Sequence, residues 1–109
     1  MTTISQALKN WEAKNEGKVA IEAQRLDLYC QTPPIAKLDA TLNTCVECER
    51  LALSTNCIDR LVSLSGMSKL KILSVGRNNL KKFEYLEGNA ATLEELWASY
   101  NQISSLDGL

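Results

Sequence analysis

Three asparagines, Asn56, Asn78 and Asn101, stand 22 and then 23 residues apart and occupy the same place in three similar segments. Apolar residues lie five and three positions before each asparagine, and two and five positions after it. A fixed period of this length is typical of a chain built from stacked repeats, each of which buries apolar residues against the next. The period therefore constrains the fold more than any other feature of the sequence.

The segments carry the signature of a leucine-rich repeat, in which the aliphatic residues of a short strand lead to an asparagine and a turn. An earlier copy from Leu26 to Leu38 is degenerate, because Gln31 replaces the asparagine and Pro33-Pro34 lengthens the turn. The sequence therefore predicts an α/β fold, a leucine-rich-repeat solenoid of short 22–23-residue repeats. One degenerate and three regular repeats would fill residues 25–109.

Each repeat is expected to place one short strand in a parallel sheet on the concave face of the solenoid. Side chains alternate along such a strand, so Leu51 and Leu53 face the core while their neighbours face outward. Apolar residues recur at every third position over residues 61–73, which predicts short 3-10-like helical turns on the convex face. A longer insert at residues 85–92 is expected to hold a fuller helical turn.

The turn asparagines, Asn56, Asn78 and Asn101, are expected to be structural. A side-chain amide at the end of a strand can bond backbone groups that would otherwise be buried without partners. Losing one amide would cost about 1–3 kcal/mol of stability.

The N-terminal residues predict a helical cap over residues 1–24. Ile4, Ala7, Leu8 and Trp11 share one face of a helix, and Thr2, Thr3 or Ser5 could begin it. A second short helical segment is expected around residues 19–24, after Gly17. Such a cap would cover the core edge of the first repeat.

The last residues look like the start of another repeat. Leu106-Asp-Gly-Leu109 reproduces Leu64-Ser-Gly-Met67, and no polar cap follows. We expect further repeats and a C-terminal cap to be missing from this sequence.

The composition of the chain narrows the classes of function that we expect. The charges of the 12 basic and 13 acidic residues nearly cancel, so no strong electrostatic field favours binding to nucleic acid or to a membrane surface. The N-terminus lacks the continuous apolar stretch of a secretory signal or membrane span, which indicates an intracellular protein. The sequence has no histidine, which excludes histidine-based triads and most zinc sites. We therefore expect no enzyme activity, no metal and no cofactor.

Four cysteines are present, and Cys45 and Cys48 form a C-x-x-C pair. No second pair follows at zinc spacing, and both residues continue the apolar register that leads to Leu51. We expect reduced thiols that act as small apolar residues of the convex core.

The outward strand positions are the candidate partner-binding surface, because repeat proteins bind partners on such surfaces and exposed Trp, Tyr and Arg often dominate interfaces. The alternative for Trp97 is packing against a following repeat. Arg77 and Tyr100 precede the asparagines of successive repeats and could stack. The predicted partner-binding residues are Trp97, Arg77, Tyr100, Arg50, Ile72 and Ser74.

Lys81 and Lys82, with Lys69 and Lys71, could form a basic patch that faces an acidic surface such as tubulin. The alternative is an ordinary solvated face.

Several segments resemble the leucine-rich-repeat light chains of axonemal outer-arm dynein. These segments are residues 51–58, 74–80 and 92–101, together with Pro33-Pro34-Ile35 and Leu64-Ser-Gly-Met67. The run through Trp97 and Tyr100 is more specific than the generic repeat. The resemblance covers nearly all of the chain, but the later repeats and C-terminal helical region of that family have no counterpart here.

The resemblance implies a non-catalytic subunit of a ciliary motor. Such a subunit would bind a dynein heavy chain at or near its microtubule-binding stalk tip, modulate motor activity, and have tubulin as a further candidate partner. It would lie in the cytoplasm, on the cytoskeleton of the cilium or flagellum axoneme. Two other classes stay open: a phosphatase-regulating leucine-rich-repeat scaffold and, more remotely, a redox or metal enzyme built on Cys45 and Cys48.

Overall fold

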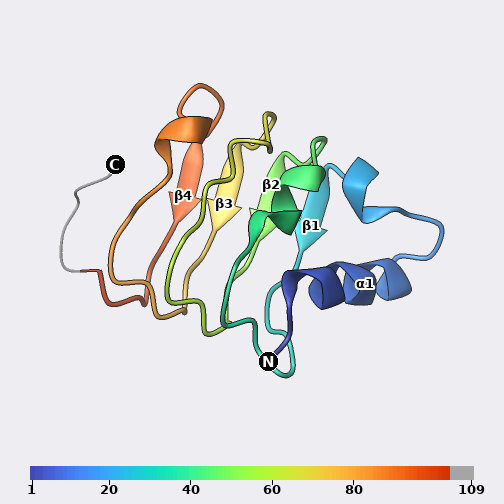
Figure 1. Ribbon diagram of the computed structural model, residues 1–109, viewed down its shortest axis with the longest axis horizontal. Helices are drawn as coiled ribbons and strands as arrows, with labels where there is room; N and C mark the ends of the chain where they lie inside the picture. Colours follow the sequence, from blue (N-terminus) through green and yellow to red (C-terminus); the bar gives the residue numbers. More distant parts are fainter. Residues whose placement is uncertain (104–109) are drawn as a thin grey trace.

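Four short strands form one parallel sheet in the structure, a computed structural model that describes residues 1–103. They stand side by side in chain order (Figure 1) as β1 (Arg25–Asp27), β2 (Arg50–Ala52), β3 (Ile72–Ser74) and β4 (Glu95–Trp97). Because neighbouring strands are parallel, each connection returns from the end of one strand to the start of the next. This α/β arrangement confirms the predicted parallel sheet and is compatible with a leucine-rich-repeat fold.

The strands are in register at their central leucines, so that Leu26, Leu51, Leu73 and Leu96 form one row. The first three are fully buried, and Leu96 is partly buried against the same core. Alternation along a strand turns the flanking residues to the opposite face. The predicted inward positions Leu51 and Leu53 are both buried, as expected.

Each return segment contains at most one short helix. The return from β1 to β2 contains the 3-10 helix η2 (Ala40–Thr44), and the return from β3 to β4 contains η3 (Glu87–Asn89). The return from β2 to β3 lies wholly among the described residues and contains turns but no helix.

The prediction of a fuller helical turn at residues 85–92 was wrong, because the structure has there only the three-residue η3. The reason lies in Asn89, whose side chain is buried and bonds the preceding return segment. Its Nδ2 donates to the carbonyl oxygens of Leu64 and Met67 at 2.9 and 3.2 Å. These two bonds fix the segment as a tight turn.

The predicted N-terminal helix is α1 (Ile4–Lys14), which lies at the β1 end of the sheet (Figure 1). Thr3 begins it, because the Thr3 hydroxyl accepts from the Gln6 N–H at 3.1 Å. Its apolar face, Ile4, Ala7, Leu8 and Trp11, is buried in the same core as the strand leucines. The second short helical segment is the 3-10 helix η1 (Ala20–Glu22). No helix among residues 1–103 has both the length and the apolar character to cross a membrane.

The three turn asparagines make one repeated set of bonds. The Oδ1 atom of each asparagine accepts a backbone N–H of the preceding repeat at 3.0 Å. The donor is Ile35 for Asn56, Ile58 for Asn78 and Leu80 for Asn101. Each Nδ2 donates to two carbonyl oxygens of its own repeat and to one of the repeat before it. Each side chain therefore joins two successive repeats.

Candidate protein-binding surface

The outward side chains of the strands form two rows across the sheet. One row is Arg25, Arg50, Ile72 and Glu95, and the other is Asp27, Ala52, Ser74 and Trp97. Together with the residues that lead from each strand to its turn, we call this surface the outward sheet face. Trp97 is 59% exposed, and the residues that precede it in the row, Ser74 on β3 and Ala52 on β2, are small.

The residue before each turn has a left-handed backbone. The φ angles of Thr55, Arg77 and Tyr100, each of which precedes an asparagine, are 57°, 55° and 62°. Cys30 precedes Gln31 and has a φ of 52°, so Gln31 takes the place of the asparagine in the first repeat. This conformation is uncommon and costly for residues other than glycine. Its repetition makes Arg77 and Tyr100 project from equivalent places of successive repeats.

Arg77 and Tyr100 are stacked. The guanidinium carbon of Arg77 lies 4.6 Å from the centroid of the Tyr100 ring, within the range of a cation–π interaction. Tyr100 is 74% exposed. With Trp97, these residues line a hollow of about 220 Å³ in the outward sheet face, which also includes Ser54, Thr55, Gly76 and Ser99.

The structure therefore brings together three of the six predicted partner-binding residues, Trp97, Arg77 and Tyr100. Ser74 lies beside Trp97 in the sheet register. Arg50 and Ile72 are register partners in the other outward row and do not line the hollow.

Sequence reasoning did not single out Thr55, which also lines the hollow. Threonine does not mark a binding surface. Only its place in the repeat, just before Asn56, could have indicated it.

Comparison with curated proteins shows how far the resemblance extends. The dynein axonemal light chain 1 of Danio rerio is 54% identical over 96 residues, which make up 88% of this chain and 50% of the relative. The Chlamydomonas reinhardtii protein of that name is 54% identical over 98 residues, 90% of this chain and 49% of the relative. The chain belongs to the dynein axonemal light chain 1 family.

The Homo sapiens dynein axonemal light chain 1 is 51% identical over 94 residues, which make up 86% of this chain and 49% of the relative. The chain thus spans about half the length of the curated family members that it matches. No protein-family model matches the sequence.

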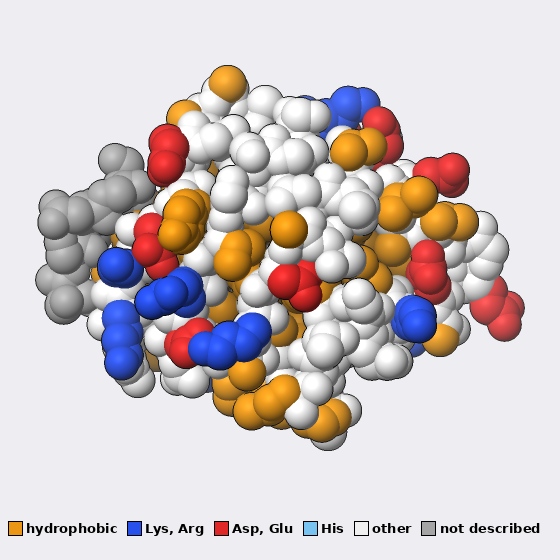
Figure 2. Space-filling view, in the orientation of Figure 1, with side chains coloured by type: hydrophobic (Ala, Val, Ile, Leu, Met, Phe, Trp, Pro, Cys, Tyr) orange, Lys and Arg blue, Asp and Glu red, His pale blue; other side chains and the backbone are white. Residues whose placement is uncertain are grey.

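Ion pairs reduce the net positive charge of the predicted basic patch in this family member. Lys69 Nζ lies 2.8 Å from Glu47 Oε2, and Lys71 Nζ lies 3.5 Å from Glu49 Oε1. Lys82 lies 3.5 Å from Glu84. Acidic side chains also lie among the basic ones on the face seen in Figure 2. The lysines therefore present much less net positive charge than their number suggests.

The cysteine pair lies in the core. Cys45 and Cys48 are both fully buried, and the Cys48 thiol donates to the carbonyl oxygen of Arg50 at 3.3 Å. Burial disfavours the thiolate and raises the pKa of both thiols, that of Cys48 to about 12. Thiols with raised pKa are poor nucleophiles and poor metal ligands at neutral pH. No group of three or more Cys, Asp or Glu side chains in the described part of the chain could hold a metal ion.

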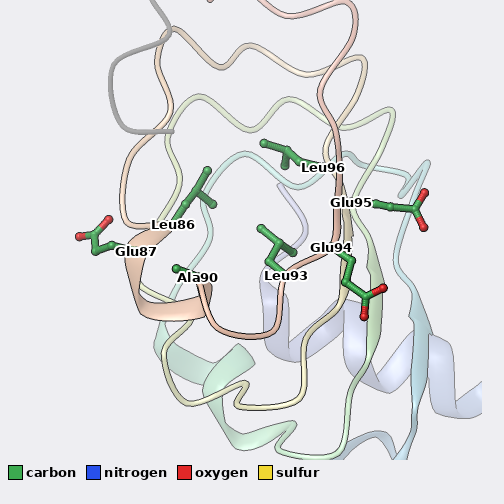
Figure 3. Close-up of a pocket in the computed structure, with 7 residues that line it drawn as sticks. All are labelled: Leu86, Glu87, Ala90, Leu93, Glu94, Glu95 and Leu96. Atoms are coloured by element: carbon green, nitrogen blue, oxygen red, sulfur yellow. The ribbon is translucent and has the colours of Figure 1, made fainter.

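A second, apolar pocket of about 520 Å³ lies between β4 and η3 (Figure 3). Leu86, Leu93 and Leu96 point toward it, and the carboxylates of Glu87 and Glu95 point away from it (Figure 3). This is the part of the core where the leucines are only partly buried. The predicted start of a further repeat at Leu106 lies outside the described residues.

Proposed function

We propose that this chain is a non-catalytic dynein subunit that binds an axonemal dynein heavy chain through the outward sheet face. Membership of the dynein axonemal light chain 1 family supports a place in that motor. The absence of histidine from the sequence supports a binding role over catalysis. The chain spans about half the length of its relatives, so the proposal concerns what this half contributes.

The proposed architecture is a leucine-rich-repeat solenoid with the sheet on its concave face. Residues 25–109 would form the repeats, and residues 1–24 would form the N-terminal cap. The repeated asparagine bonds support the first assignment. The second is supported by α1, whose apolar face packs into the core at the β1 end of the sheet.

The single observation that carries the binding proposal is the exposed Trp97 beside the Arg77–Tyr100 stack. Large aromatic and arginine side chains supply most of the binding energy of many interfaces. Ser74 and Ala52 leave room for a partner to reach the side of the indole ring. The proposed contact residues are Trp97, Arg77, Tyr100 and Ser74, with Arg50 and Ile72 in the second row.

We place the contact at or near the microtubule-binding region of the heavy chain, in the axoneme of a cilium or flagellum. There the subunit would modulate motor activity, and tubulin would be a secondary partner. The names of the relatives support the axoneme. The pairing of Lys69, Lys71 and Lys82 with carboxylates makes a strong independent contact with acidic tubulin less favourable.

The test is a pull-down from axonemal extract with the tagged chain, followed by mass spectrometry. We expect a dynein heavy chain with the wild type and much less of it with Trp97→Ala. Tyr85→Ala is the matched control, because Tyr85 is an exposed aromatic in a return segment, outside the outward sheet face. Equal recovery with both variants would reject the surface, and recovery of no heavy chain would reject the partner.

A further inference from the structure

One outward row of the sheet carries charges of opposite sign on the two sides of an apolar residue. Arg50 on β2, Ile72 on β3 and Glu95 on β4 are direct register partners. Neighbouring strands lie about 4.8 Å apart, so the Arg50 and Glu95 backbones are about 10 Å apart with Ile72 between them. The row therefore runs from basic through apolar to acidic.

Neither Arg50 nor Glu95 is neutralised by an ion pair within the described residues. The ion pairs around it involve other side chains: Arg25 with Asp27 at 3.1 Å, and Lys71 with Glu49 at 3.5 Å. Arg50 and Glu95 are exposed and take part in no ion pair among residues 1–103. Both charges are thus available to a partner.

Fold stability does not explain Arg50. Its register partner on β1 is Arg25, and like charges directly opposite one another destabilise a sheet. Arg25 is compensated by Asp27, whereas Arg50 has no such carboxylate among the described residues. An unpaired arginine beside another arginine has a physical reason if a partner supplies the missing negative charge.

We infer that the outward sheet face binds its partner in one direction only, fixed by this row. The partner segment would present an acidic side chain to Arg50, an apolar one to Ile72 and a basic one to Glu95. Complementary charges at both ends of a contact favour one register and penalise the reversed one. The inference rests on the proposed function, in which the segment belongs to a dynein heavy chain, and adds the direction in which that segment lies.

The test separates the effect of the order of the charges along the row from the effect of the net charge. Affinity would be measured for the purified microtubule-binding domain of an axonemal dynein heavy chain, with the wild type and with the double variant Arg50→Glu, Glu95→Lys. The double variant keeps the net charge and reverses the order. We expect it to bind at least about tenfold more weakly in low-salt buffer. The difference should shrink in about 1 M salt, where the Debye length is about 3 Å.

A neutral double variant, Arg50→Gln with Glu95→Gln, is the control for a folding defect. Both positions are exposed, so its unfolding temperature should match that of the wild type. Its affinity should lie between the other two and depend less on salt. Equal affinity of the wild type and the reversed variant would overturn the inference while leaving the partner in place. No binding by the wild type would overturn the proposed function and the inference together.

Discussion

The side-chain oxygen of Asn78 accepts the backbone N–H of Ile58, in the preceding repeat, at 3.0 Å. The same side chain donates to the carbonyl oxygens of Leu53 and Val75 at 3.0 and 2.9 Å. Asn78 is 6% exposed, so water cannot readily replace these bonds. One amide thus satisfies buried backbone groups on both sides of the boundary between two repeats.

Asn78→Ala should lower the free energy of unfolding by about 3 kcal/mol, because it leaves several buried backbone groups without partners. Urea denaturation followed by circular dichroism measures this loss. Asn79→Ala is the control, since Asn79 is exposed and its side chain makes no hydrogen bond among the described residues. Equal stability of the two variants would contradict a structural role for Asn78.

Gly66→Ala should destabilise the chain by about 1–3 kcal/mol through crowding. A Cβ atom at Gly66 would lie 2.6 Å from the Cβ of Asn43, whose Oδ1 accepts the Gly66 N–H at 2.8 Å. Thermal unfolding would be compared with Ser68→Ala, at an exposed position of the same return segment. An unchanged unfolding temperature for Gly66→Ala would show that the segments can move apart without cost.

The buried thiol of Cys48 should make stability fall at alkaline pH. Its pKa is raised by burial from 9.0 to about 12, so the fold favours the neutral thiol. This contribution is complete below pH 9.0 and is lost as the pH rises through the interval up to about 12. Between pH 8 and pH 10 the wild type should lose about 1.4 kcal/mol more than Cys48→Ala. Parallel pH profiles of unfolding free energy for the two proteins would reject this account.

Arg77→Asn should separate binding from stability. Asparagine adopts the left-handed backbone more readily than arginine, so stability should stay level or rise by up to about 1 kcal/mol. Binding to the heavy-chain domain should weaken about tenfold, because the guanidinium over Tyr100 is lost. Arg60→Asn removes an exposed arginine outside the outward sheet face and should bind as the wild type does. A stable Arg77→Asn variant with unchanged affinity would remove Arg77 from the contact.

Much of the fold followed from the spacing of apolar residues in the sequence. The period of the asparagines led to the parallel strands and the inward leucines, and the Ile4–Trp11 pattern led to α1. These features depend on local patterns that a short window of sequence contains. The 3-10 turn η3 was not foreseen in its true length, because Asn89 bonds residues more than 20 positions away.

The candidate surface was foreseen in its outward strand positions and in Arg77 and Tyr100, which precede two of the asparagines. Alternation predicts which side chains point outward, and so it identified Trp97 and Ser74. The left-handed backbone at Thr55, Arg77 and Tyr100 carries no signal in residue type, since none of these is glycine or asparagine. The hollow that these residues share depends on that backbone shape and had to come from the structure.

The most direct test of which face binds is site-specific photo-crosslinking. A photo-reactive benzophenone residue would be placed at Ser99, in the hollow of the outward sheet face, or at Ser63, exposed in the return segment between β2 and β3. After irradiation with the purified heavy-chain domain, the account predicts a covalent product from Ser99 and little or none from Ser63. A product from Ser63 alone would contradict it, because the partner would then lie on the opposite side of the repeats.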